Sequence, residues 1–353
     1  EELKIIRRNQ IAAGQPPRYT GVWSQASKEE VQEELDKGNK PVYRFRIPKK
    51  ETISFMDLVK GQQSFATDDL DDFIVRKKDS SPTFMFANAI DDSLMGGDLV
   101  LRGDDHLSNT PRQIALLDSL NLSLPRYAHV SLFTGSDGAP LSKRNGSLSI
   151  SDLKEMGYLP IAVANYLSRV GHTINDNDLK TQKELADSFE TKNISSSPSK
   201  FDLDQLLFWQ KKAVDNLTID ECAGWLSGNL DNLPPTVQER SFIELIKENV
   251  NFPSEAREYV NNLFINALSG DEENLKIIQS AGQEFFILAL EVVNPGISDW
   301  KQTCKDIEAR TGKKGKELFM PLRVAITGQT RGPELDKVIE LIGLERVLER
   351  LKE

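Results

Sequence analysis

The sequence has little cysteine and no long apolar run. Its 353 residues include only two cysteines, Cys222 and Cys304, which lie far apart along the chain. A disulfide framework or a cysteine-rich metal site is therefore not expected. A membrane helix needs about 20 consecutive apolar residues, and the sequence shows neither such a run nor a signal-peptide pattern. It therefore predicts a cytoplasmic protein without a membrane partner.

Basic residues are also fewer than acidic ones. The 44 lysines and arginines are outnumbered by 54 aspartates and glutamates, which gives a net charge of −10. This balance argues against non-specific binding to a polyanion, although a local basic face can still bind one. Basic residues gather at Lys49-Lys50, Arg76 to Lys78, Lys143-Arg144, Lys211-Lys212, and Lys313-Lys314 with Lys316. Each cluster taken alone is more often a solvated surface than a binding site.

Two kinds of pattern follow one another along the chain. Residues 1–13 predict a helix, and short alternating segments at 42–47, 52–59 and 73–78 predict strands. The apolar run "DLVLRGDDH" predicts a further strand, and in the helix that follows it Thr110 has the character of an N-cap and Pro111 that of the first helical residue. From about residue 152 the periodicity is helical. We therefore predict an α/β portion followed by an all-α domain.

A charged group follows the strand that ends at "RGDDH". Ligands bind beyond the carboxyl ends of strands in open α/β sheets, which is where Arg102 and His106 are expected. Two interpretations of Arg102 stay open. Either Asp104 or Asp105 holds it in a structural ion pair, or its planar fork of donors receives a substrate carboxylate. His106 taken alone is more often a core histidine.

A second candidate site is the stretch "PLSKRNGSLSI", residues 140–150. Lys143 and Arg144 lie between Gly138 and Gly146, so the loop could close over a triphosphate. A lysine ammonium neutralises phosphate charge, and glycine permits close backbone approach. The tripeptide by itself is more often a solvated turn.

Taken together and in order, five segments resemble the glutamyl-tRNA synthetases of bacterial and organellar type. They are "PTFMFANAIDDSLMG", "VLRGDDHLSNTPRQ", "PRYAHVSLFTGSDGAPLSKRNGSLSI", "GYLPIAVANYLSRVG" and "GKELFMPLRVAITGQTRGPEL". The resemblance covers nearly the whole chain. It implies the C-terminal part of a class I synthetase Rossmann domain with its connective region, followed by a helical anticodon-binding domain.

The resemblance also implies domain limits. They are a connective, acceptor-stem-binding region at 1–80, the second half of the Rossmann catalytic domain with a KMSKS-type loop at 81–150, a helical stem-contact region at 151–194, and the anticodon-binding domain at 195–353. The family's first Rossmann strand and its HIGH signature would precede Glu1. We therefore expect the chain to be part of a longer protein and inactive by itself. With no cysteine before Cys222, no structural zinc is expected.

Site residues follow from the same resemblance. "PLSKR" stands where the family has KMSKS, with Pro140 in place of a frequent lysine, and Lys143 would be the catalytic, phosphate-contacting residue. Arg102 and Asn88 match glutamate-binding positions. Phe84 stands at a third, where the family usually has tyrosine, and the missing hydroxyl could cost about 1 kcal/mol. The expected ATP-binding residues are Leu141, Ser142, Lys143 and Arg144.

Contacts with tRNA are expected in the helical domain. Arg323, Thr327 and Arg331 are candidates for reading anticodon bases, and the alternative is that they belong to a packed helix junction. Lys313, Lys314 and Lys316 are candidates for phosphate contacts.

The activity implied is ATP-dependent activation of glutamate, with Mg²⁺, and its transfer to the 3′ end of glutamate tRNA by a monomeric enzyme. Two alternatives stay open. The enzyme could be non-discriminating and also charge glutamine tRNA. The chain could instead be a truncated paralogue that binds tRNA without chemistry.

Overall fold

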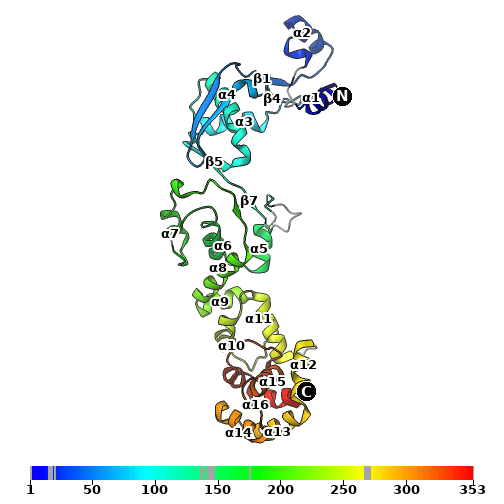
Figure 1. Cartoon of the computed structure of the whole chain (residues 1–353), viewed down its shortest axis with the longest axis vertical. Helices are drawn as coiled ribbons and strands as arrows, with labels where there is room; N and C mark the ends of the chain where they lie inside the picture. The colour runs from blue at the N-terminus through cyan, green and yellow to red at the C-terminus, as the bar shows by residue number, and fades with distance from the viewer. Residues whose placement is uncertain are drawn as a thin grey trace. The chain divides into compact units, whose positions relative to one another are not determined.

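The computed structural model describes residues 2–14, 19, 21–135, 138–139, 141, 148–174, 176–265 and 272–352. The chain forms two compact units. Unit 1 comprises Glu1–Asn145, Arg169–Asn175 and Ser188–Phe201, and unit 2 comprises Gly146–Ser168, Asp176–Asp187 and Asp202–Glu353. Figure 1 labels the elements of both, and each unit is described by itself.

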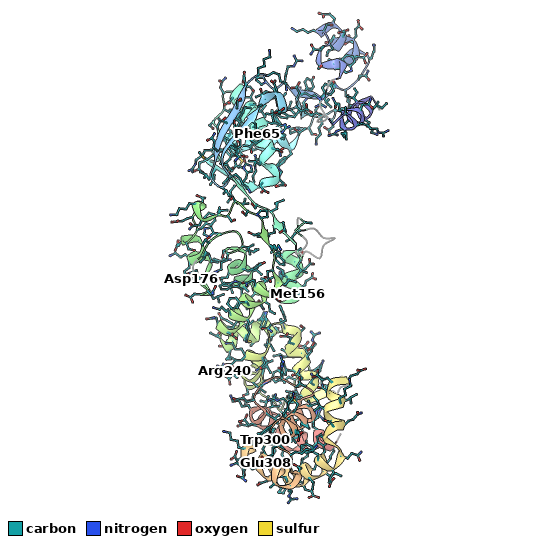
Figure 2. The ribbon with its side chains drawn as sticks, viewed as in Figure 1. Phe65, Met156, Asp176, Arg240, Trp300 and Glu308 are labelled. Carbon is teal, nitrogen blue, oxygen red and sulfur yellow. The ribbon has the colours of Figure 1, made fainter. Side chains whose placement is uncertain are left out.

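Unit 1 is built on a four-stranded sheet with the order β3-β2-β6-β5. Its strands are β2 (Thr52–Asp57), β3 (Gly61–Ala66), β5 (Leu99–Gly103) and β6 (Arg126–Val130). β2 and β3 form an antiparallel hairpin, whereas β6 runs parallel to both β2 and β5. Side chains of the hairpin, including Phe65, are drawn in Figure 2. The parallel pairing sets Arg102 directly opposite His129, which fixes the position of the site described below.

Smaller elements complete unit 1. α3 (Phe84–Leu94) and α4 (Thr110–Ser119) pack together beside the sheet (Figure 1), with Ala89, Leu116 and Leu117 buried between them and neighbouring phenylalanines. The remaining helices are α1 (Glu2–Ala12), η1 (Val22–Ser24), α2 (Lys28–Asp36), η2 (Thr67–Asp69), η3 (Asp104–Asn109) and η5 (Thr191–Asn193). The remaining strands pair as β1 (Tyr43–Phe45) with β4 (Phe73–Arg76), and as β7 (Phe133–Thr134) with β8 (Ser199–Lys200).

Most of the elements predicted for unit 1 are confirmed. α1 covers the predicted first helix, and β1, β2, β4 and β5 lie in the predicted strand segments. The N-cap prediction at Thr110 is wrong. The preceding 3-10 helix η3 runs directly into α4, so that Asn109 occupies the cap position in a helical conformation and Thr110 lies inside the helix. Its hydroxyl is thereby available for another role.

Unit 2 is helical, as predicted. Its helices are α5 (Ile150–Met156), α6 (Pro160–Leu167), α7 (Gln182–Asp187), α8 (Leu203–Asn216), α9 (Ile219–Leu226), α10 (Glu239–Ile246), η6 (Lys247–Asn249), α11 (Pro253–Val260), the π-helix Asn261–Ile265, α12 (Glu272–Ala281), α13 (Gln283–Val293), α14 (Trp300–Thr311), α15 (Lys316–Thr327) and α16 (Leu335–Lys352). One continuous apolar cluster runs from α9 to α16 and includes the fully buried Phe242, Leu322 and Val347. Each such side chain contributes about 1.5–3 kcal/mol on burial.

A tight junction connects the first helices of unit 2 with its core. Gly157 ends α5 in the left-handed conformation, with φ +92°. Its carbonyl accepts hydrogen bonds from Trp225 Nε1 at 2.9 Å and from Gln210 Nε2 at 3.3 Å. A Cβ atom at this position would lie 2.4 Å from Pro253 Cδ. Only glycine satisfies both the backbone conformation and the packing there.

We expect Gly157→Ala to lower the free energy of unfolding by about 2–5 kcal/mol, the sum of left-handed strain and steric overlap. Gly228 is the matched control, because it also has a positive φ, +76°, but no atom lies within 4 Å of the position that a Cβ would take. Gly228→Ala should cost only the strain, about 1–2 kcal/mol. Urea denaturation measures both, and equal losses would show that the contact with Pro253 is unimportant.

Candidate functional site

The guanidinium of Arg102 lies at the carboxyl end of β5, inside a cage of neutral groups. Its Nη2 donates to Thr110 Oγ1 at 2.8 Å and to Gln113 Oε1 at 2.7 Å. Its Nη1 donates to Asn88 Oδ1 at 3.3 Å, and its Nε donates to His129 Nε2 at 3.1 Å. α3, α4 and β6 thus each supply acceptors to one cation, and none of these acceptors is a carboxylate.

The two aspartates that follow β5 have other partners. Asp104 pairs with Lys60 Nζ at 2.9 Å, and Asp105 Oδ2 lies 3.7 Å from His106 Nε2. No ion pair joins Arg102 to an acidic side chain in the part of the chain that the structure describes. The structural ion-pair interpretation of Arg102 is therefore wrong. The core-histidine interpretation of His106 is wrong as well, because its side chain is 36% exposed.

Burial and distant charges act on Arg102 in opposite directions. Burial lowers the pKa of its guanidinium from the ordinary value, while Tyr127 and the carboxylates of Asp92, Asp105 and Asp57 raise it. An arginine keeps its proton in proteins. The site therefore holds a half-buried positive charge that no adjacent carboxylate neutralises among the described residues, and such a charge favours an anionic ligand.

α3 brings two predicted glutamate-binding residues to the same side. Phe84 and Asn88 are four residues apart, so they share one face of the helix. Asn88 Oδ1 accepts hydrogen bonds from Arg102 Nη1 and, at 3.2 Å, from Gln113 Nε2. The amide NH₂ of Asn88 donates to no group within the described ranges, so it is available to a ligand. Phe84 is 60% exposed, and its ring lies 5.6 Å from that of His106.

Sequence reasoning missed the groups that hold Arg102 in place. Gln113, His129 and Asp57 are each at most 1% exposed, and Asp57 Oδ2 lies 2.5 Å from His129 Nδ1. A histidine in the apolar strand "YAHV" and an aspartate after "TISFM" were the available signals. Both residues are buried polar groups in apolar segments, and such groups need partners.

The pKa values of the buried pair follow from burial and hydrogen bonding. Burial raises the pKa of Asp57, but hydrogen bonds from the backbone of Lys60, from the His129 side chain and from the backbone of Val59 outweigh it, and the net pKa is lowered. Burial lowers the pKa of His129 below its ordinary value, and the neighbouring Asp57 only partly offsets this effect. The pair therefore consists of a carboxylate and a neutral imidazole.

The predicted ATP-binding loop falls largely outside the described residues. Ser142, Lys143 and Arg144 lie outside them, whereas Leu141 is described, and its backbone N donates to Phe133 O at 3.0 Å. Gly135 N donates to Ala139 O at 2.8 Å. The stem of the loop is thus anchored to β7.

The predicted anticodon-reading residues surround one loop of unit 2. Residues 328–332, including Arg331, line a cavity of about 380 Å³ together with Tyr259 and Asn274. Arg323 and Thr327 do not line it. Arg323 Nη2 donates to Pro333 O at 2.9 Å, and the buried Thr327 hydroxyl accepts from Gln329 N at 3.2 Å. Arg323 and Thr327 thus hold the loop through hydrogen bonds and do not line the cavity.

The three predicted phosphate-binding lysines differ in their surroundings. Lys313 Nζ donates to Ala281 O at 2.7 Å and lies 5.2 Å from the Phe285 ring centre, which is a structural role at the end of α12. Lys314 is 76% exposed and pairs with Glu308 at 3.1 Å. Lys316 is exposed at the start of α15. Lys314 and Lys316 can therefore meet a phosphate without disturbing the core.

Two other kinds of feature are absent from the described residues. No group of three or more histidine, cysteine, aspartate or glutamate side chains is arranged to hold a metal ion there. None of the helices in those ranges is both long and apolar enough to cross a membrane.

Family comparisons fit this architecture. Residues 1–208 match the family model described as tRNA synthetases class I (E and Q), catalytic domain. Residues 219–353 match the model of an anticodon binding domain. The chain is thus a class I synthetase catalytic domain followed by a helical anticodon-binding domain, and the predicted fold class is confirmed.

Individual relatives narrow this class. Glutamate–tRNA ligase 1 of Halorhodospira halophila is 45% identical over 351 residues, which are 99% of this chain and 73% of that protein. Glutamate–tRNA ligase 2 of Nitrosococcus oceani is also 45% identical, over all of this chain and 75% of that protein. The chain belongs to the glutamate–tRNA ligase family, as the resemblance implied.

A solved structure shows the same fold. It is a glutamate tRNA ligase from Elizabethkingia meningosepticum in complex with its amino acid, and it matches with a TM-score of 0.84 at 24% identity. The match covers 99% of this chain and 76% of that one.

The lowered pKa of His129 has a consequence for stability. Because the folded chain favours neutral His129, the unfolded chain binds more protons below the ordinary pKa of 6.5. The contribution of neutral His129 to the free energy of unfolding should therefore be present above pH 6.5 and be lost as the pH falls below it. Urea unfolding between about pH 5 and 8 measures this slope. His129→Gln, which cannot titrate, should flatten it, and an unchanged slope would contradict the assignment.

Proposed function

We propose that this protein acts as a glutamate–tRNA ligase, in which Arg102 and Asn88 bind glutamate. The observation that carries the proposal is the uncompensated Arg102 cation at the carboxyl end of β5, on a chain whose relatives have this name. A carboxylate is the ligand that such a site favours. Cytoplasmic location and a monomeric state belong to the same proposal.

Charge and donor count explain how the site would choose glutamate. A glutamate side-chain carboxylate accepts hydrogen bonds from Arg102 and from the available amide of Asn88, with charge assistance from the guanidinium. Glutamine has no charge, and its side-chain NH₂, itself a donor, would face the donors of Arg102 and Asn88. A site built to hydrogen-bond its substrate strongly rejects an analogue that leaves the site's donors unpaired. Phe84 supplies apolar surface without a hydroxyl at this site.

The chemistry proceeds in two steps. A glutamate α-carboxylate oxygen attacks the α-phosphorus of ATP, and pyrophosphate leaves. A hydroxyl of the terminal tRNA adenosine then attacks the mixed anhydride, and AMP leaves. We assign Leu141, Ser142, Lys143 and Arg144 to ATP on their motif, and Mg²⁺ bound with ATP would neutralise phosphate charge. Positioning of the reactants provides much of the acceleration in such a reaction.

The domain assignment extends the proposal to tRNA. Residues 1–80 would contact the acceptor stem, 81–150 would form the catalytic half-domain, 151–194 would contact the stem, and 195–353 would read the anticodon. The cavity beside Arg331 is supported as a base-binding site by its size and by the polar groups around it. Arg323 and Thr327 would act there by holding the loop, through the bond from Arg323 Nη2 to Pro333 O and the bond from Gln329 N to the Thr327 hydroxyl.

Arg102→Ala tests the glutamate site in the active enzyme. Loss of the guanidinium leaves a bound carboxylate unpaired, which costs about 2–5 kcal/mol. We expect this loss in kcat/KM for glutamate. The control is Arg126→Ala on β6, where an exposed arginine pairs with Asp98 at 3.0 Å. If both variants kept the wild-type value, Arg102 would not bind glutamate.

Salt dependence tests the contacts with tRNA. Replacing Lys314 and Lys316 by alanine should flatten the plot of log affinity against log salt by up to about 0.9 for each phosphate that is no longer neutralised, without changing the preference among anticodons. Arg126→Ala is the control, because Arg126 is also an exposed, ion-paired cation, with Asp98 at 3.0 Å, and lies in the catalytic half-domain outside the proposed tRNA-contact regions. Arg331→Ala should instead relax anticodon preference by about 1–3 kcal/mol. A double variant with the wild-type slope would leave the lysines as a solvated surface.

A further inference from the structure

We infer that Asp57 and His129 are positioning residues for glutamate binding. Asp57 fixes the tautomer of His129, and His129 in turn orients the Arg102 guanidinium so that one of its N–H groups remains for the substrate carboxylate. The inference rests on the proposed function, and it adds two residues that do not touch the substrate.

The contacts determine the tautomer of His129. An arginine nitrogen can only donate a hydrogen bond. His129 Nε2, which receives the Nε–H of Arg102 at 3.1 Å, must therefore carry its lone pair, and the Thr110 hydroxyl, also 3.1 Å from Nε2, then donates to it as well. The imidazole proton then lies on Nδ1, where Asp57 Oδ2 accepts it at 2.5 Å. His129 is thus neutral and protonated on Nδ1.

Asp57 is itself fixed from the backbone. Its Oδ1 accepts hydrogen bonds from Val59 N at 3.0 Å, Lys60 N at 2.8 Å and His129 N at 3.1 Å. These three bonds use one carboxylate oxygen and direct the other toward the imidazole. The turn after β2 therefore sets the carboxylate, and the carboxylate sets the histidine.

These contacts leave one N–H group of Arg102 for a ligand. A guanidinium has five N–H groups. Nε uses its one on His129, Nη2 uses two on Thr110 and Gln113, and Nη1 uses one on Asn88. One N–H of Nη1 remains, next to the available NH₂ of Asn88. A carboxylate would thus be bound by one donor from each residue, and not by a two-pronged arginine fork.

The charged groups around His129 support the neutral form. Asp57 from β2 and, farther away, Asp104 from η3 favour protonation, while Arg102 from β5 and burial oppose it. Tyr127 of the same strand stacks on the imidazole, with ring centres 6.3 Å apart. A second proton would sit on Nε2 and face the Arg102 donor. Protonation would therefore break the bond that orients the guanidinium.

Asp57→Asn should reverse the tautomer of His129. The carbonyl oxygen of the introduced asparagine would keep the three backbone hydrogen bonds, so its NH₂ would face His129 Nδ1. A donor there moves the imidazole proton to Nε2, where it opposes Arg102. His129→Gln should preserve both hydrogen bonds of residue 129, because the glutamine amide can donate to Asp57 and accept from Arg102. His129→Leu can do neither.

Nitrogen NMR of ¹⁵N-histidine-labelled protein reads the tautomer directly, since the chain has three histidines. We expect Nδ1–H for His129 in the wild type and Nε2–H in Asp57→Asn. Asp98→Asn, at an exposed ion pair on the same sheet, should leave the signals unchanged. An Nε2–H tautomer in the wild type, or no change in Asp57→Asn, would overturn the inference.

Kinetics of the active enzyme test the positioning role. Asp57→Asn and His129→Leu should raise the KM for glutamate on the order of tenfold or more, with the KM for ATP unchanged and with His129→Gln close to wild type. A merely structural role would lower the amount of folded enzyme and leave KM alone. If the tautomer switched while the KM for glutamate stayed constant, the positioning role would be wrong and the proposed function would stand. Should Asp57→Asn fail to fold, the two His129 variants decide.

Discussion

The half-buried cation of Arg102 is the constraint on which unit 1 depends. A charge removed from water needs several hydrogen bonds if no opposite charge compensates it. Parallel pairing of β5 with β6 sets His129 opposite Arg102, and α3 and α4 supply amide and hydroxyl acceptors. Without the arginine, the buried Gln113 Oε1 would lose the hydrogen bond that Arg102 Nη2 donates to it. The site and the packing of these elements therefore stabilise one another.

Unit 2 differs from unit 1, because its stability comes from an apolar cluster. Its buried polar groups serve to end helices and hold loops. Gln210, fully buried, bonds to the backbone of Leu159 and Asn251. Thr327 bonds within the turn that follows α15. These bonds satisfy the backbone groups that helix ends leave over. The exposed Arg331 lies on the loop after α15 that these hydrogen bonds hold.

Local signals in the sequence were sufficient for most elements, whereas the candidate glutamate-binding residues came from the family resemblance. The strand β3 was missed because "GQQSFA" has few apolar residues, and hairpin pairing with β2 stabilises it instead. The cap at Thr110 was misassigned because η3 runs directly into α4 and places Thr110 inside the helix. Asp57 and His129 are 72 residues apart, and no local pattern connects them. Their pairing depends on the order of strands in the sheet, which is a tertiary property.

The way Arg102 is held also bears on selectivity. An arginine already paired with a carboxylate would gain little from a second one, whereas a cation surrounded by neutral acceptors gains its first ion pair when an acidic ligand arrives. Because four neutral groups already hydrogen-bond the half-buried cation, part of its desolvation cost is offset before a ligand arrives, and an anionic ligand adds Coulomb attraction. An uncharged isostere would bring no such attraction and would leave the available donors of Arg102 and Asn88 unpaired. Neutral partners in the resting site would therefore make the proposed glutamate site selective for charge.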